Sequence, residues 1–154
     1  MHARRQIINS VYSVLTATSH VEWKHVYKSR LAPQRDVLPF LLIHIDDESD
    51  SEMTFTPSPV VLRDMILSID ANVRIPSDSE EFEVSLDAAA EEIESVLTFD
   101  AVDTDLGGYL KNLNLQGSTS EIIEDDMDRT YARITLTYNV QVVTTMGDSA
   151  TLIN

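Results

Sequence analysis

Carboxylates and histidines are the side chains of this sequence that could carry chemistry. Asp64 with Asp70, or His44 with Asp46, could pair as general acid and base or bind Mg²⁺ through carboxylate oxygens. The chain has four histidines without metal-ligand spacing, and it contains no serine-hydrolase, zinc-protease or phosphate-loop motif. We therefore expect no enzyme activity, no catalytic or metal-binding residues and no cofactor. A metal-dependent hydrolase with clustered carboxylates remains an alternative.

Two dense acidic runs invite a metal-site interpretation. The first, DDESDSE, covers residues 46–52, and an EF-hand loop would need alternating ligands, a glycine at its sixth position and a glutamate at its twelfth. These are not present, so the run predicts a protruding, solvated acidic loop over residues 46–59. The second run, Glu121 to Asp128, predicts a solvated connection.

The Gly107-Gly108 pair could cradle a phosphate only within a strand-to-helix motif. Neither GxxxxGK[ST] nor GxGxxG surrounds it, so we expect a turn. Leucines before Gly117 and isoleucines after it predict a short strand pair around that glycine.

Two helices are expected. Residues 85–97, SLDAAAEEIESVL, place their apolar residues on one face, with Ser85 as a plausible N-cap. Residues 2–18 form a second amphipathic helix, and both need a sheet to lie on. The apolar residues of the two stripes are Leu86, Ala89, Ala90, Ile93 and Leu97, and Ala3, Ile7, Val11, Val14 and Leu15.

Period-two alternation predicts the strands of that sheet. Residues 21–28 read as a half-buried strand that carries His25 as a packed histidine, and residues 38–45 are apolar on both faces. Residues 60–75 and 129–145 are the strongest strand predictions. Because strands average five or six residues, two this long indicate a ribbon, an adjacent pair that projects, or a bend or bulge.

Composition fits a single domain, 1–154, without cysteine and without an apolar run long enough to span a membrane. The N-terminus does not resemble a signal peptide. The tail, 146–154, has little pattern and is expected to be ordered only by a neighbour.

The net charge of −15 is unevenly distributed. Residues 1–35 contain six basic residues and one acidic residue, a net charge of +5, whereas the rest carries −20. Such an acidic chain should repel DNA and anionic membranes. Its basic segment, however, could attract the acidic surface of another copy.

The order of several segments resembles the tail terminator family of long, non-contractile-tailed phages, whose members are also named minor tail or tail completion proteins. The segments are MHARRQI, SRLAPQRDVLP before LLIHIDDES, SLDAAAEEIE, LGGYLKNLNLQGS and RITLTYNV. The resemblance runs nearly from end to end.

This resemblance implies an α/β fold of the α+β type, in which a mixed, mostly antiparallel sheet carries two helices on one face. It implies a hexameric ring on the head-proximal end of the tail tube, which stops tube polymerisation and meets head-completion or connector proteins. DNA would pass through the ring without specific binding. The protein would be located in the virion, after assembly in the host cytoplasm.

Ring closure needs two different complementary patches on each copy. We predict a positive patch formed by Arg4, Arg5, Arg30 and Arg35. The negative patch would come from one of the acidic runs, through Asp46, Asp47, Glu48, Asp50 and Glu52 or through Glu124, Asp125 and Asp126. The alternative is a small ligand-binding or regulatory dimer of the same fold class, with an apolar pocket and no catalytic role.

Overall fold

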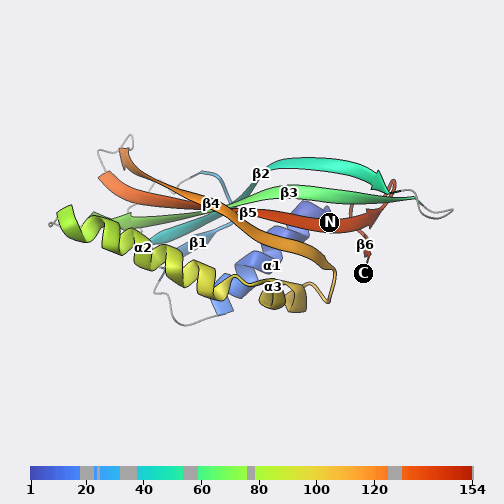
Figure 1. The fold of residues 1–154 in the computed structure, drawn as a ribbon, viewed down its shortest axis with the longest axis horizontal. Helices are drawn as coiled ribbons and strands as arrows, with labels where there is room; N and C mark the ends of the chain where they lie inside the picture. Colours follow the sequence, from blue (N-terminus) through green and yellow to red (C-terminus); the bar gives the residue numbers. More distant parts are fainter. Residues whose placement is uncertain are drawn as a thin grey trace.

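The computed structural model describes residues 1–17, 23, 25–31, 38–53, 59–75, 79–124 and 130–153. Long strands run along the longest axis of the molecule (Figure 1). In chain order the elements are α1 (Ala3–Ala17), β1 (His25–Tyr27), β2 (Phe40–Met53), β3 (Val60–Arg74), α2 (Ser79–Val96), α3 (Phe99–Asp105), β4 (Leu110–Glu124), β5 (Thr130–Thr145) and β6 (Leu152–Ile153).

One six-stranded sheet dominates the fold. Its order is β1-β2-β3-β5-β4, and β6 pairs with β5. Strand β1 runs parallel to β2, and the other described pairings are antiparallel. The predicted α+β class is confirmed, with a mixed sheet.

The two strongest strand predictions form the centre of this sheet. Strands β3 and β5 pair without a register break from Val60 opposite Thr145 to Arg74 opposite Tyr131. They are therefore the adjacent pair, and the bulges lie in their outer neighbours. Strand β2 shifts register between Ile45 and Asp47, and β4 shifts between Leu110 and Asn112 and between Leu115 and Gly117.

The main core lies between one side of the sheet and the helices. It contains residues of α1, α2 and α3 together with alternate residues of the strands, such as Met65, Leu67 and Ile69 of β3. Every apolar residue of the two predicted helical stripes is buried in it. Helix α2 nevertheless begins at Ser79, so Ser85 lies inside it and is not its N-cap. The apolar stripe marks only the part of the helix that packs on the core, so it does not show where the helix begins.

A smaller apolar cluster lies on the opposite side of the sheet. The first half of β2 is therefore buried on both faces, as predicted. Leu38, Phe40 and Leu42 gather there with Tyr131, and the rings of Phe40 and Tyr131 meet edge to face at 5.9 Å. His25 was expected to be packed. Its ring does stack on Tyr27 at 5.6 Å, but its side chain is exposed.

The acidic run 46–52 is not a loop tip. Residues Asp46 to Met53 are the second half of β2, and after the bulge at Asp46 they pair with β3 as far as Val60. The long β3 strand supplies backbone partners along its whole length, and these hydrogen bonds outweigh the low strand propensity of the acids. Residues 54–58 of the predicted loop lie outside the described residues.

Two further predictions are corrected near the second acidic run. Gly117 sits at a bulge within the continuous strand β4, not between two short strands, and Glu121 to Glu124 belong to that strand. Helix α3 was not predicted. It is capped by Thr98, whose side chain accepts a hydrogen bond from the backbone of Ala101. The Gly107-Gly108 turn is confirmed, and both glycines have positive φ, 76° and 88°.

The C-terminal segment is held by its own chain. Leu152 and Ile153 pair with Thr144 and Val143 of β5, and the backbone N–H of Ala3 donates to the carbonyl of Ser149 at 2.8 Å. The expectation that only a neighbour orders this tail is therefore wrong for residues 146–153. None of the helices described in the structure is both long and apolar enough to cross a membrane.

Candidate interaction surfaces

His44 lies between two carboxylates on the side of the sheet opposite the main core. Its Nε2 is 3.1 Å from Asp70 Oδ2, and its Nδ1 is 2.8 Å from Asp46 Oδ1, the second contact having the geometry of an ion pair rather than a hydrogen bond. Thr135 Oγ1 donates to Asp70 at 2.8 Å, and Ser68 donates to Asp46. These contacts hold the β2 bulge at Asp46 against β3.

The electrostatics of this group favour a charged pair. The hydrogen bond to Asp70 raises the pKa of His44 above its usual value, although burial acts in the opposite direction. Burial would raise the pKa of Asp70, but hydrogen bonds from His44 and Thr135 outweigh it and leave that pKa lowered. The oxygens of Asp70 and the nitrogens of His44 are thus committed to neighbours within the sheet.

The other suggested pair, Asp64 with Asp70, shares a strand face but not an interaction. Asp64 instead accepts hydrogen bonds from Asn139 and from Gln141, the latter at 3.1 Å. Among the described residues, no group of three or more histidine, cysteine, aspartate or glutamate side chains is placed to hold a metal ion. Asp64 and Asp70 are therefore bound to other side chains of the sheet and not to each other.

Arg63 neutralises part of the acidic run at the other end of β2. Its Nη1 lies 3.1 Å from Glu48 Oε2 and 3.0 Å from Asp50 Oδ2, and its Nε donates to Thr144 Oγ1 at 2.9 Å. Burial is the largest of the causes that raise the pKa of Glu48, the neighbouring Asp50 adds to the increase, and the charge of Arg63 opposes it. Glu48 and Asp50, predicted as interface residues, are thus engaged within the chain.

The remaining predicted acids have different positions. Asp47 and Glu52 are exposed on β2, and Glu124 is exposed at the end of β4. Asp46, as described above, contacts His44. Asp125 and Asp126 lie outside the described residues. In the first run, all of which the structure describes, three of the five acids are therefore engaged within the chain and two are exposed.

Three of the four predicted arginines do come together. Arg4, Arg5 and Arg30 line a cavity of about 430 Å³ between the start of α1 and β2, and Arg35 lies outside the described residues. His2 and Lys28 also line it, next to Ile43, His44 and Ile45 of β2. We call this cavity the cationic pocket. Lys28 was not among the predicted patch residues, because the 28–30 segment gives no pattern that places it beside α1.

The described part of the chain gives the cations of this pocket no acidic partner. Among the described residues, Arg4, Arg5, Lys28 and Arg30 form no ion pair, although the chain has 26 acidic residues. Lys28 donates to Asn9 Oδ1 at 3.1 Å and lies 4.6 Å from the centre of the Tyr12 ring. Two arginines in the first turn of α1 also oppose the helix dipole, which costs about 0.3–1 kcal/mol for each charge. The positive potential of the pocket is therefore available to an anionic partner.

The pocket borders an open edge of the sheet. Strand β1 pairs with β2 only from Phe40 to Leu42, so in the described part of the chain the outer backbone edge of β2 is free of strand partners from Ile43 onward. The guanidinium of Arg30 donates to the carbonyl of Ile45 on this edge. At the other side of the sheet, β4 forms the second edge.

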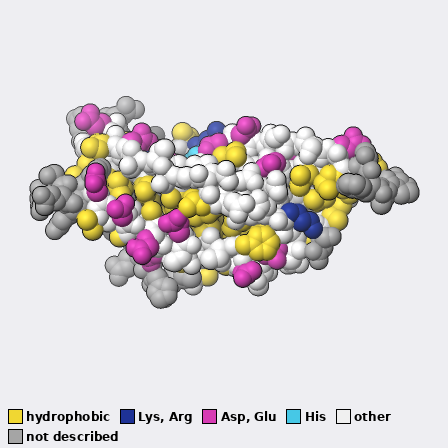
Figure 2. All heavy atoms as spheres, in the orientation of Figure 1, with side chains coloured by type: hydrophobic (Ala, Val, Ile, Leu, Met, Phe, Trp, Pro, Cys, Tyr) yellow, Lys and Arg dark blue, Asp and Glu magenta, His cyan; other side chains and the backbone are white. Residues whose placement is uncertain are grey.

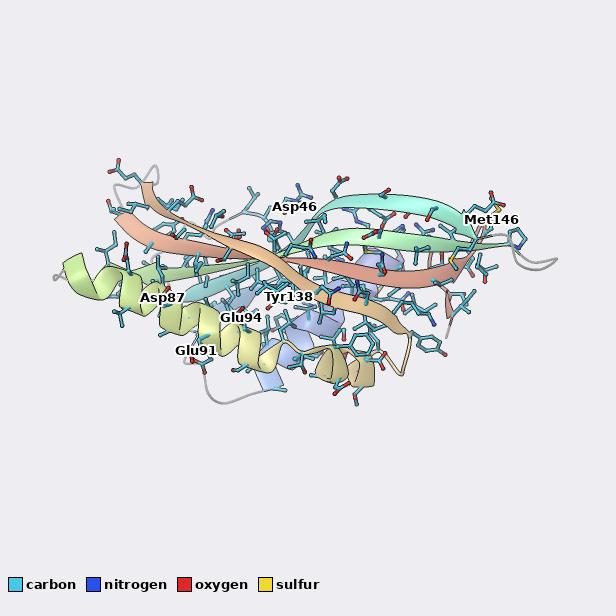
Figure 3. The ribbon with its side chains drawn as sticks, viewed as in Figure 1. Asp46, Asp87, Glu91, Glu94, Tyr138 and Met146 are labelled. Carbon is cyan, nitrogen blue, oxygen red and sulfur yellow. The ribbon has the colours of Figure 1, made fainter. Side chains whose placement is uncertain are left out.

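A row of carboxylates follows the outer face of α2. Glu83, Asp87, Glu91 and Glu94 are exposed and recur at helical spacing, which aligns them on one face. We call them the α2 acidic row. Figure 3 labels three of them, and Figure 2 shows acidic side chains gathered along this helix. Residues 79–96 contain no lysine or arginine. Two features of the sequence could have identified this row. Its acids lie outside the apolar stripe of the helix, and the helix contains no basic residue.

Comparison with known proteins supports the fold. No protein-family model matches the sequence, and no curated protein does either. Among solved structures, the chain is similar to one from the virion of a native gene transfer agent particle. The likeness covers 94% of this chain and 100% of that chain, with a TM-score of 0.54 and 17% sequence identity. At this level of identity, the likeness shows a shared fold.

Proposed function

We propose that this chain is a structural protein of a phage-like virion and acts as a tail terminator. Six copies form a ring on the head-proximal end of the tail tube, stop its polymerisation and offer a surface to head-completion or connector proteins. The observation that supports this most strongly is the fold shared with a virion chain over the full length of that chain. The order of sequence segments that resembles tail terminators agrees with it.

The surfaces of the molecule fit repeated assembly. Each copy carries two different charged surfaces, the cationic pocket and the α2 acidic row, and two sheet edges, β2 and β4. A contact between unlike patches closes into a ring when its rotation is a whole fraction of a turn. Exposed ion pairs contribute only about 0–1 kcal/mol each, so apolar burial between copies must supply most of the affinity.

The same proposal accounts for the acidity of the chain. A net charge of −15 disfavours tight binding to DNA, which suits a ring through which DNA passes. In this role the chain transforms no molecule and needs no cofactor. Its partners are other copies of itself, the tube protein and the head-completion protein, in a virion assembled in the host cytoplasm.

Electron microscopy of the tube protein polymerised with and without this chain tests the proposal. We expect tubes of limited length that carry a ring at one end when the chain is present, and longer, uncapped tubes in its absence. Particles assembled without the chain should lack heads. Tubes of equal length in both reactions, or a stable dimer that leaves tube ends bare, would contradict the proposed role.

A further inference from the structure

The proposed ring leaves open which surfaces of neighbouring copies meet. We propose that the α2 acidic row of one copy docks on the cationic pocket of the next copy. This inference rests on the proposed function and names the contact that would build the ring. It differs from the sequence prediction, which assigned the negative patch to residues 46–52 or 121–128.

Three of the five acids of β2 are poor candidates for this contact, and the other two, Asp47 and Glu52, do not form a row like that of α2. Asp46 is held by His44 and Ser68, while Glu48 and Asp50 are bound to Arg63. To reach a neighbouring copy they would have to leave their own cations, which would then be unpaired. The carboxylates of α2 have no such commitment among the described residues, so they can be neutralised by a partner without loss inside the chain.

Both charged surfaces are unfavourable within an isolated copy. Arg4 and Arg5 lie at the positive end of α1, and Glu91 and Glu94 lie near the negative end of α2. Docking one surface on the other relieves both unfavourable arrangements at once. Arginine can bind a carboxylate through two parallel hydrogen bonds, which fixes orientation as well as charge.

The sizes of the two surfaces limit how they can meet. The row from Glu83 to Glu94 spans eleven helical rises, or about 16 Å, and its carboxylates project from the helix. A cavity of about 430 Å³ admits these side chains but not the body of a helix. The contact would therefore place α2 across the mouth of the pocket.

Exposed apolar side chains flank both surfaces. Leu31, which follows Arg30, is 80% exposed, and Val84 on α2 is 66% exposed. Val84 lies one residue from Glu83, beside the acidic row. Exposed apolar side chains beside the charges can add apolar burial to charge complementarity when the two surfaces dock.

The two surfaces are separated within one copy, so they cannot satisfy each other. The N-terminus and α2 lie in different halves of the molecule along its longest axis (Figure 1). The contact must then join two copies head to tail. Repetition of such a contact gives a ring or an open filament, according to the rotation between copies.

Disulfide trapping tests the contact directly, because the chain has no cysteine of its own. One sample carries Arg5→Cys and the other Glu91→Cys, and the two are mixed under mild oxidation. The matched control replaces Glu91→Cys by Asp100→Cys, an exposed acid on α3. We expect about tenfold more cross-linked heterodimer for the Glu91 variant than for the control, which corresponds to about 1.4 kcal/mol. Equal yields would overturn the inference.

The same cysteine pairs, placed in rings on tube ends, separate this inference from the proposed function. Capped tubes with no cross-link between residues 5 and 91 would keep the terminator role and reject this contact. Charge exchange provides a second measurement. Arg5→Glu or Glu91→Lys should each weaken association by about tenfold, and a chain that carries both should recover it. Failure of the double variant to recover, with its circular dichroism unchanged, would also count against the contact.

Discussion

Replacement of Arg63 by methionine should show how the acidic half of β2 is held in the sheet. Arg63 is only 8% exposed, and it contacts Glu48, Asp50 and Thr144 at 2.9–3.1 Å. Removal of one partner from a buried ion pair costs about 3–5 kcal/mol. The side chain of Asp50 is 39% exposed, whereas that of Glu48 is 15% exposed, so solvent screens part of this cost. We expect the free energy of unfolding to fall by about 2–3 kcal/mol.

The loss should depend on pH with a defined sign. Arg63 opposes the increase in the pKa of Glu48 that burial and Asp50 cause, so without Arg63 this pKa rises further. A carboxyl group whose folded pKa exceeds its unfolded pKa binds its proton more tightly in the native state. Protonation of Glu48 therefore stabilises the folded state. This contribution is lost as the pH rises from 4.5, the usual pKa of glutamate, through the raised pKa. The difference between variant and wild type should be smaller near pH 4.5 than near pH 7.

Urea unfolding at these two pH values measures both effects. Arg74→Met is the matched control, because Arg74 is exposed at the end of β3 and should change stability by less than about 0.5 kcal/mol. In the background of Arg63→Met, the further changes Glu48→Gln and Asp50→Asn should recover much of the loss at pH 7. If Arg63→Met were no more destabilising than the control, the ion cluster would not be what holds this half of β2.

Three further substitutions test other contacts by the same unfolding assay. His44→Gln should destabilise by about 1–2 kcal/mol between the usual pKa values of aspartate, 3.8, and histidine, 6.5, where both partners are charged. Because the folded pKa of His44 is raised, this difference should shrink as pH rises through that pKa, and a constant difference would contradict the charged pair. Burial raises the pKa of Tyr138 to about 12, and its hydroxyl has no hydrogen-bond partner in the described structure. Tyr138→Phe should therefore be neutral or stabilising by up to about 1 kcal/mol, and a clear loss would reveal a missing partner. Gly107→Ala should cost about 1–2 kcal/mol because φ is 76°, whereas Gly117→Ala, whose added Cβ meets no atom within 4 Å, should cost far less, and equal losses would remove the backbone explanation.

Much of the fold could be predicted because its pattern is local. Strands β3 and β5 have 15 and 16 residues and alternate over most of that length, and each apolar residue of the helical stripes of α1 and α2 is buried. Such patterns follow from the geometry of a strand or a helix and need no knowledge of distant residues. The Gly107-Gly108 turn was predictable for the same reason.

The features that were missed depend on distant partners. The acids of β2 show no apolar alternation, and the cation that neutralises two of them, Arg63, lies 13 residues beyond Asp50. The pairing of β4 beyond Gly117 depends on β5, which follows it in the chain. Helix α3 has only seven residues, too few for a clear periodic signal. Local propensity is overridden in each case by contacts that form only in the folded sheet.

The arginine patch was predictable only in part. A count of charges identified the basic N-terminal segment, and the structure brings Arg4, Arg5 and Arg30 to one cavity. The count could not show which acids remain available, because that depends on partners within the fold. Residues 46–52 looked like the strongest acidic patch in sequence, yet three of their acids contact His44 or Arg63.

The distinction between paired and unpaired charge decides where an acidic chain can associate with itself. At a net charge of −15, two copies repel each other over distances longer than a contact. At physiological salt this repulsion is screened beyond about 8 Å, whereas an ion pair formed at contact is screened much less. Association therefore requires local cations that no acid of the same copy has already neutralised. Within the described residues the cationic pocket meets that requirement with several cations close together, whereas Arg63 does not, so the pocket beside the open edge of β2 is a surface able to bring copies together.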